Sequence, residues 1–262
     1  MLYSIYIHHI HRIHQTNTPF REIMADIHLD SDLLNYIVQQ AFQPGDRLPT
    51  ISELEHADKL GISVSKVREQ LEVARALGLV EVRSKTGTRL KEYSFTPAVR
   101  LSLFFALATD LRYFELFSAV RAHLEAAFWH EACALLTDDD KREIRGYLDA
   151  ARAKLNAPRI RIPSEEHRNF HLTIFKHLDN PFVLGLLEAY WDAYEAVELN
   201  RYADYSYLQQ VWDYHERILD AICADDFDAA QKAFIEHTHL LHHQPRMQDM
   251  EGAAPIENEV TS

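Results

Sequence analysis

The sequence predicts a mainly α protein, in which an N-terminal winged helix-turn-helix is followed by an all-helical bundle of six or seven helices. Two regions of the chain support this prediction. Residues 47–90 contain two short segments of helical apolar spacing and then two short alternating segments. From about residue 98, apolar residues recur at helical spacing, glycine and proline are scarce, and the alternation typical of strands is missing.

The helix-turn-helix is predicted from apolar spacing and from residues that end helices. The first segment stops at Gly61, and its apolar residues are Ile51, Leu54, Ala57 and Leu60. Ser63 is a typical N-cap for the second helix, whose apolar residues are Val67, Leu71, Ala74 and Leu77. Residues 79–83 and 88–90 alternate like strands around a tight turn at 84–87, which predicts a β-hairpin, the wing.

Positive charge gathers on these elements. Lys66 and Arg68 lie near the start of the second helix, and Arg83, Lys85 and Arg89 lie on the hairpin. Each of these residues alone is as readily explained by an ordinary solvent-exposed charge as by a DNA contact. Together they predict contact with DNA phosphates and bases. The net charge of −13 does not oppose this, because nine basic residues against eight acidic ones lie in 44–92, whereas sixteen against twenty-eight lie in 93–262.

The same region resembles the DNA-binding domain of the GntR family of bacterial transcriptional regulators. The residues on the family pattern are Gly45, Leu48, Pro49, Glu53, Leu54, Ser63, Val67, Arg68, Glu69, Leu71, Gly78, Leu79, Val80 and Gly87. Two positions depart, since Ser52 and Val64 stand where arginines are usual, and Val64 suits a thymine methyl instead. The resemblance implies a homodimer on a palindromic operator, contacted by Arg47, Ser63, Val64, Ser65, Lys66, Arg68, Arg83, Lys85, Thr86 and Gly87.

The domain organisation is predicted from breaks in composition. A disordered leader is expected over 1–23, with Met24 as the natural start. A cap at Asp30 or Ser31 begins the first helix of the DNA-binding domain, 24–92. A linker over 93–98, a helical domain over 99–245 and a disordered tail over 246–262 follow. The expected bundle helices cover 98–109, 111–135, 138–156, 164–178, 181–201, 205–224 and 226–243.

Four histidines of the bundle are candidate metal ligands. His167 and His171 are four residues apart on one expected helix and share a face, while His215 and His237 lie on the last two helices. Imidazole nitrogens bind zinc and similar transition metals. For any one histidine, a hydrogen-bonded core or a surface position remains the alternative.

The bundle resembles the FCD effector domain of the FadR/VanR-like branch of the same family, over about 99–243. Phe170-His171, His215 to Ile218, and Ala229 with Ala233 and His237 fit its three motifs. The resemblance implies a metal site at His167, His171, His215 and His237, although His167 replaces the family's aspartate. A site with four neutral ligands favours zinc, nickel or cobalt over manganese, with zinc or nickel expected.

The same resemblance implies an effector site for a small organic acid beside the metal. Arg121 and Glu125 match the Arg-x-x-x-Glu pattern, and a guanidinium suits bidentate capture of a carboxylate. A simple intrahelical ion pair is the alternative. Further candidates for the cavity are Asn200, Arg201 and the aromatic residues Tyr190, Trp191, Tyr194 and Trp212, although such an aromatic stripe is more often core.

Three function classes follow from these features. A ligand-responsive transcriptional regulator is favoured, a zinc-type hydrolase acting in the helical domain is the alternative, and a purely architectural DNA-binding protein is the third. The predicted winged helix-turn-helix argues against an enzyme. The large helical bundle with polar residues in its interior argues against a purely architectural DNA-binding protein. Two cysteines without a spaced framework fit a reducing cytoplasm, and no apolar run approaches membrane-spanning length.

Overall fold

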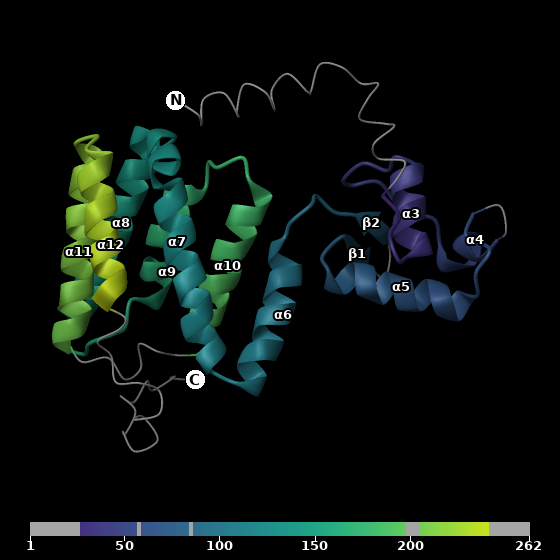
Figure 1. Ribbon diagram of the computed structural model, residues 1–262, viewed down its shortest axis with the longest axis horizontal. Helices are drawn as coiled ribbons and strands as arrows, with labels where there is room; N and C mark the ends of the chain where they lie inside the picture. The colour runs from purple at the N-terminus through teal and green to yellow at the C-terminus, as the bar shows by residue number, and fades with distance from the viewer. Residues whose placement is uncertain (1–26, 57–58, 84–85, 198–204, 241–262) are drawn as a thin grey trace. The chain divides into compact units, whose positions relative to one another are not determined.

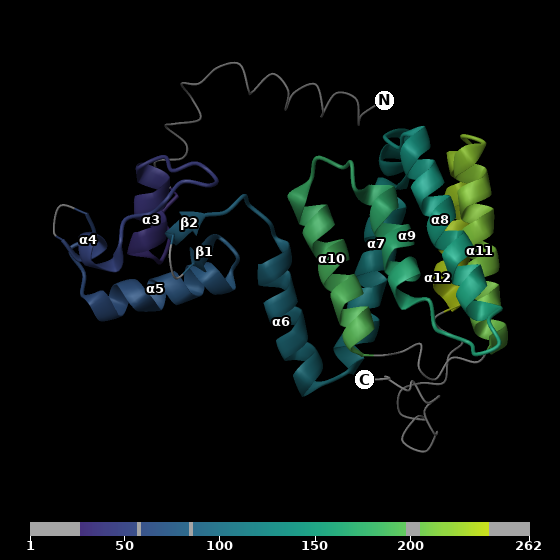
Figure 2. The ribbon, with the colours of Figure 1, turned by 180° about the vertical axis from the view of Figure 1, so that it is seen from behind.

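The computed structural model describes residues 27–56, 59–83, 86–197 and 205–240 (Figure 1 and Figure 2). The chain divides into two compact units, Met1–Glu92 and Tyr93–Ser262. The expected leader and tail, and the predicted site residues Lys85, Asn200 and Arg201, lie outside the described residues.

The N-terminal unit is a winged helix-turn-helix, as predicted. Its elements are α3 (Asp32–Gln39), α4 (Ile51–Glu55), α5 (Val64–Ala76), β1 (Val80–Arg83) and β2 (Gly87–Leu90). The strands pair antiparallel, with Val80 opposite Leu90 and Arg83 opposite Gly87. Its core consists of Leu33, Ile37, Leu48, Leu54, Val67, Leu71, Ala74 and Val80.

Side-chain caps fix where the helices of this unit begin. Ser31 caps α3, Ser63 caps α5, and Thr50 forms a reciprocal capping box with Glu53 at the start of α4. Gly78 follows α5 with φ at +73°, a left-handed conformation that favours glycine at a helix end. The capping signals in the sequence therefore located the starts of α3 and α5, whereas the cap of α4 at Thr50 was not predicted.

Helix α4 is shorter than the apolar spacing predicted. It ends at Glu55, because His56 has an extended backbone with ψ at 144°. Leu60 nevertheless packs against the same core, and its backbone N–H donates to the Leu54 carbonyl over 3.2 Å. The apolar pattern identified Ile51, Leu54 and Leu60 correctly as side chains of this core, while Ala57 lies outside the described residues. A turn rather than a continuous helix brings Leu60 there.

The C-terminal unit contains seven helices in its described residues. They are α6 (Thr96–Thr109), α7 (Arg112–Ala134), α8 (Asp138–Leu155), α9 (Ser164–Phe175), α10 (Pro181–Ala196), α11 (Tyr205–Cys223) and α12 (Phe227–Leu240). Helix α6 includes residues 96–98, which the sequence assigned to the linker. Among the described residues, no helix is both long enough and apolar enough to cross a membrane.

Two apolar clusters hold these helices together. In the larger cluster, Trp129 of α7 stacks on Phe234 of α12 with 4.7 Å between ring centroids. The smaller cluster joins α6, α7 and α10. Helix α10 approaches the start of α6 so closely that a Cβ added at Gly185 would lie 2.8 Å from the backbone nitrogen of Thr96. Helices α7, α9, α11 and α12 surround the candidate site described next.

Candidate functional sites

Four buried histidines of the C-terminal unit converge, as predicted for a metal site. His167 and His171 come from α9, His215 from α11 and His237 from α12. One ligand nitrogen of each ring lies within 4.8 Å of those of the other three. The four residues are at most 7 % exposed. Four nitrogen ligands at such spacing match the ligand number of a zinc site.

Local structure positions three of the rings. His167 and His171 project from one face of α9, because they are separated by about one helical turn. On α11, His215 Nδ1 donates to the Val211 carbonyl over 2.7 Å. That bond leaves the lone pair of His215 Nε2 available, and this atom lies 3.1 Å from His171 Nε2. A carbonyl behind the ring is the usual support for a metal-ligating histidine.

Two nitrogens of the cluster have no hydrogen-bond partner among the described residues. They are His167 Nε2 and His237 Nδ1, and both are buried. Leaving a buried polar atom unpaired costs about 1–3 kcal/mol. A cation between the rings would interact with such lone pairs, and imidazole nitrogen is a good donor to zinc, nickel and cobalt. The residues present therefore fit a divalent transition metal.

The surroundings keep these imidazoles neutral. Burial lowers the pKa of His167, His171 and His237 well below the ordinary value, and positive charge on neighbouring groups, including Arg121, lowers each further. Burial also lowers the pKa of His215 to about 3, although its hydrogen bond to the backbone opposes this shift. Neutral imidazole is the form that coordinates metals.

Arg121 and Glu125 of α7 lie beside the histidines. Arg121 Nε lies 2.6 Å from Glu125 Oε2, and Arg121 Nη2 lies 3.0 Å from His171 Nδ1. Both charged residues are buried, at 3 % and 0 % exposure. Burial raises the pKa of Glu125 to about 7, while Arg121 acts in the opposite direction. The pair is therefore more than a surface ion pair, because it contacts the histidine cluster directly.

Aromatic rings enclose the Arg121 guanidinium. Its central carbon lies 4.9 Å from the Tyr190 ring centroid, 5.1 Å from that of Trp191 and 5.7 Å from that of Phe234. Trp191 also stacks on His171, with 4.9 Å between centroids. From the sequence, the four aromatic candidates could belong either to the core or to the cavity wall. All four are buried core residues, and Tyr190 and Trp191 also pack against the Arg121 guanidinium.

A cavity of about 300 Å³ lies between α7 and α12 and reaches Arg121. Its lining residues are Ser118, Ala119, Arg121, Ala122, His123, Ala126, Ile235, Thr238 and His239. A cavity of this size is at the lower end of the range for small-molecule sites. The guanidinium places a fixed positive charge in its wall, which suits an anionic ligand.

On the N-terminal unit, the first turn of α5 exposes the side chains predicted to contact DNA. Ser63 Oγ accepts from the Lys66 backbone N–H over 3.3 Å, so this hydroxyl is committed to the cap. Ser65, Lys66 and Arg68 are exposed, and Val64 is partly exposed. Lys66 pairs with Glu69 over 3.0 Å, but exposed pairs of this kind are weak and do not withdraw the ammonium from phosphates.

The wing carries Arg83 and Thr86, both exposed, and Gly87 near its tip. Gly87 has φ at +80°, and a Cβ there would lie 3.0 Å from Arg47 Nε. Glycine therefore permits both the turn and the close approach of Arg47, whose side chain is exposed beside the hairpin.

Arg89 does not join this exposed group. Its guanidinium donates to the Gly45 carbonyl over 2.6 Å, and it is only partly exposed. The sequence suggested a DNA-contacting role for Arg89 from its place on the hairpin. The structure shows a contact within the domain, because β2 brings Arg89 next to the turn before α4, and a contact with DNA stays a prediction.

Two domain families match these units. "Bacterial regulatory proteins, gntR family" matches residues 28–90, and "FCD domain" matches residues 115–240. The protein is thus a transcriptional regulator by class. It belongs to the GntR family and carries an FCD domain, as the sequence motifs predicted.

Known relatives agree with this class. The chain is 28 % identical over 224 residues to the Uxu operon transcriptional regulator of Escherichia coli (strain K12), covering 84 % of this chain and 83 % of that protein. It is also 28 % identical over 203 residues to the HTH-type transcriptional regulator LutR of Bacillus subtilis (strain 168), covering 74 % and 89 %. These relatives are regulators, which confirms the prediction of a non-enzyme and leaves the hydrolase alternative without support.

A solved structure shares the fold. The Streptococcus agalactiae GntR structure aligns with a TM-score of 0.58 at 21 % identity and covers 81 % of this chain and 96 % of that one. At this identity the likeness concerns the fold alone.

Proposed function

We propose that this regulator binds a palindromic operator as a homodimer and responds to a small organic acid at a metal centre in its FCD domain. The convergence of four buried histidines beside a buried arginine carries the proposal. Both features lie in the unit that does not read DNA, as a ligand-sensing site requires.

The proposed metal ligands are His167, His171, His215 and His237. The all-nitrogen set favours zinc or nickel over manganese, which prefers oxygen ligands. A bound divalent ion would supply a positively charged, Lewis-acidic centre, and one carboxylate oxygen would be a fifth ligand beside the four imidazoles. Because the four ligands are neutral, they leave the charge of the ion uncompensated, and this favours an anionic effector.

Arg121 is the proposed partner of the effector carboxylate. Its planar guanidinium can donate two parallel hydrogen bonds, and Glu125 and the surrounding aromatic rings hold it in place. The cavity of about 300 Å³ gives the acid a route to this group and limits its size. A role for Asn200 and Arg201 stays a prediction from the sequence.

DNA binding is assigned to the exposed start of α5 and to the wing. We assign base contacts to Val64, Ser65 and Arg68, and phosphate contacts to Arg47, Lys66, Arg83 and the predicted Lys85. Ser63 holds the end of α5, while Thr86 and Gly87 shape and present the wing. The effector changes operator affinity only as far as it binds one of two arrangements of the dimer more tightly than the other. Such coupling typically changes the affinity by 5- to 150-fold.

A gel-shift assay on a palindromic operator tests this function. The metal-loaded protein should change its operator affinity when gluconate, lactate or citrate is titrated in, and chelator treatment should abolish the response. Arg121→Met should lose the response while still binding operator, whereas His130→Gln, at an exposed position of α7, should behave like the wild type. An effector response that survives in both the chelator-treated protein and Arg121→Met would contradict the proposal.

A further inference from the structure

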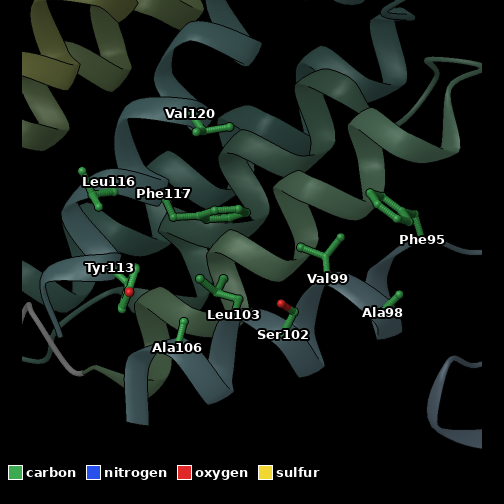
Figure 3. A pocket seen from close by; sticks show the side chains of 10 residues that line it. All are labelled: Phe95, Ala98, Val99, Ser102, Leu103, Ala106, Tyr113, Leu116, Phe117 and Val120. Atoms are coloured by element: carbon green, nitrogen blue, oxygen red, sulfur yellow. The ribbon is translucent and has the colours of Figure 1, made fainter. Parts of the chain in front are cut away.

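Helix α7 borders two different environments. On one side, residues of α6 and α7 line an apolar cavity of about 460 Å³, which Figure 3 shows with Val120 at its wall. None of the lining residues is charged, so this cavity offers no partner to a buried ion. The next residue, Arg121, and Glu125, one turn further on, lie instead at the histidine cluster. The two buried charges of α7 are therefore placed where the metal is proposed to bind.

Two of the four histidine rings have an oxygen behind the nitrogen that faces away from the cluster. For His215 this oxygen is the Val211 carbonyl, which accepts from Nδ1 over 2.7 Å. For His171 it is Glu125 Oε1, which lies 3.5 Å from Nδ1. His171 Nε2 lies 3.1 Å from His215 Nε2, so both rings present Nε2 to the same space. Glu125 thus has the place behind His171 that the Val211 carbonyl has behind His215.

The position of the ring hydrogen decides which neighbour His171 can use. A neutral imidazole carries one hydrogen, and a ring that binds a metal through Nε2 carries it on Nδ1. Arg121 Nη2, which lies 3.0 Å from Nδ1, cannot then be its partner, because a guanidinium only donates. Glu125 Oε1 can be, since a carboxylate accepts and this atom has no hydrogen-bond partner among the described residues.

We propose that Glu125 is a positioning residue of the metal centre, whose carboxylate accepts from His171 Nδ1 and so holds His171 Nε2 toward the ion. A carboxylate behind a metal-ligating histidine fixes the ring hydrogen and the orientation of the ring, and it makes the imidazole a stronger ligand. This role rests on the metal centre of the proposed function. It differs from the effector contact that the sequence predicted for Glu125.

The charge of Glu125 supports the same role. Among the described residues, it is the one acidic side chain that pairs with a histidine of the cluster. Two other buried carboxylates of the C-terminal unit are committed elsewhere, since Asp140 pairs with Lys176 and Glu166 pairs with Lys154. Four neutral imidazoles bring no negative charge to a divalent ion, so Glu125 supplies that charge beside them.

Arg121 permits the burial of Glu125 and opposes its effect on the ion. A carboxylate with 0 % exposure needs a partner, and Arg121 Nε lies 2.6 Å from Glu125 Oε2. The guanidinium also lies beside His171, where its positive charge repels a metal ion. Because the two charges cancel, the ion keeps its excess charge for an anionic effector. Removing one charge at a time should therefore change the metal affinity in opposite directions, which a purely structural ion pair would not do.

Zinc dissociation constants of the full-length protein, measured at about pH 8 by competition with a chelating dye, test this role. Glu125→Gln should weaken zinc binding roughly 10- to 100-fold, as removal of such a partner usually does. Glu125→Asp keeps the carboxylate and should recover part of this loss. Arg121→Met should bind zinc at least as tightly as the wild type, because a repelling charge is removed. Glu131→Gln makes the same change at an exposed position of α7 and should stay within about threefold of the wild type.

Glu125→Gln leaves Arg121 buried without a counter-charge, which is destabilising in itself. The same substitution is therefore repeated in the Arg121→Met background, where no buried charge is left alone, and it should again weaken zinc binding about tenfold or more. Glu125→Gln proteins that stay within about threefold of their parents in both backgrounds would overturn the positioning role and leave the metal centre standing. Equal weakening by Arg121→Met and Glu125→Gln would do the same. A wild type that binds no zinc would overturn both.

Discussion

Acidification should destabilise the C-terminal unit of the chelator-treated protein. Burial holds the pKa of the four clustered histidines below the ordinary value of about 6.5 that they regain on unfolding. A histidine whose pKa is lowered in the folded state stabilises that state above pH 6.5. This stabilisation is lost as the pH falls, because only the unfolded state takes up the proton. The stability of this unit should therefore fall between pH 7.5 and pH 5.5.

The size of this loss follows from the number of groups. Each histidine that stays neutral when folded costs about 1.4 kcal/mol over these two pH units, so four cost about 5 kcal/mol. Glu125 acts in the opposite direction. Because its pKa is raised to about 7, the folded state takes up a proton at a higher pH than the unfolded state does, and this offsets about 1–2 kcal/mol of the loss. Asp140 has a lowered pKa, so its contribution is lost only in stronger acid. The net loss should be about 3–4 kcal/mol.

Urea denaturation followed by tryptophan fluorescence isolates this unit. The three tryptophans of the chain, Trp129, Trp191 and Trp212, are all buried there. His167→Gln should reduce the pH-dependent loss by about 1.4 kcal/mol, one histidine's share, while the exposed His130→Gln should not change it. A wild-type free energy of unfolding that stays flat or rises as the pH is lowered from 7.5 to 5.5 would show that the folded state also protonates these histidines.

Three further changes test the packing and the DNA-reading surface. Trp129→Ala should lower the free energy of unfolding by about 3–5 kcal/mol, measured by circular dichroism in urea, and a loss under 1 kcal/mol would contradict its place in the core. Gly185→Ala should cost about 1–3 kcal/mol, because its Cβ would meet the backbone of Thr96; an unchanged melting temperature would argue against that close contact. Arg68→Ala should weaken operator binding by about 1–3 kcal/mol, and Lys66→Ala should reduce the salt slope by about one, whereas unaltered gel shifts for both would remove α5 from the interface.

The helix starts were predictable because local chemistry determines them. Thr137 caps α8 through a capping box with Asp140, and Asn180 caps α10 just before Pro181, so both helices begin where the sequence placed them. Helix α4 was predicted too long, since the spacing of apolar residues does not distinguish a helix from a turn that returns to the same core. Leu60 shows this ambiguity.

The candidate metal site was only half predictable from the residues. The spacing of His167 and His171 places two ligands on one face, but His215 and His237 join them only through tertiary packing, which the family resemblance supplied. Nothing in the spacing of Arg121 and Glu125 reveals the contact of the guanidinium with His171 or its aromatic enclosure. These depend on how α7, α9 and α10 pack.

Helix α6 exposes part of its apolar surface, and the spacing of apolar residues in the sequence does not predict this exposure. Residues 101–108 are almost entirely apolar, which predicts a helix buried on all sides as readily as a helix with an exposed apolar stripe. The structure distinguishes the two, because Leu107 is buried while Phe105 is exposed.

Elemental analysis of full-length protein purified without a metal column shows whether the four histidines bind a metal. We expect about one zinc or nickel ion per chain, a metal content near zero in His215→Ala, and wild-type content in His130→Gln. Metal at 100 times its dissociation constant should stabilise the chelator-treated wild type by about 2.7 kcal/mol. A wild-type protein that contains no metal, and whose melting temperature does not change when zinc or nickel is added, would contradict a metal site at these histidines.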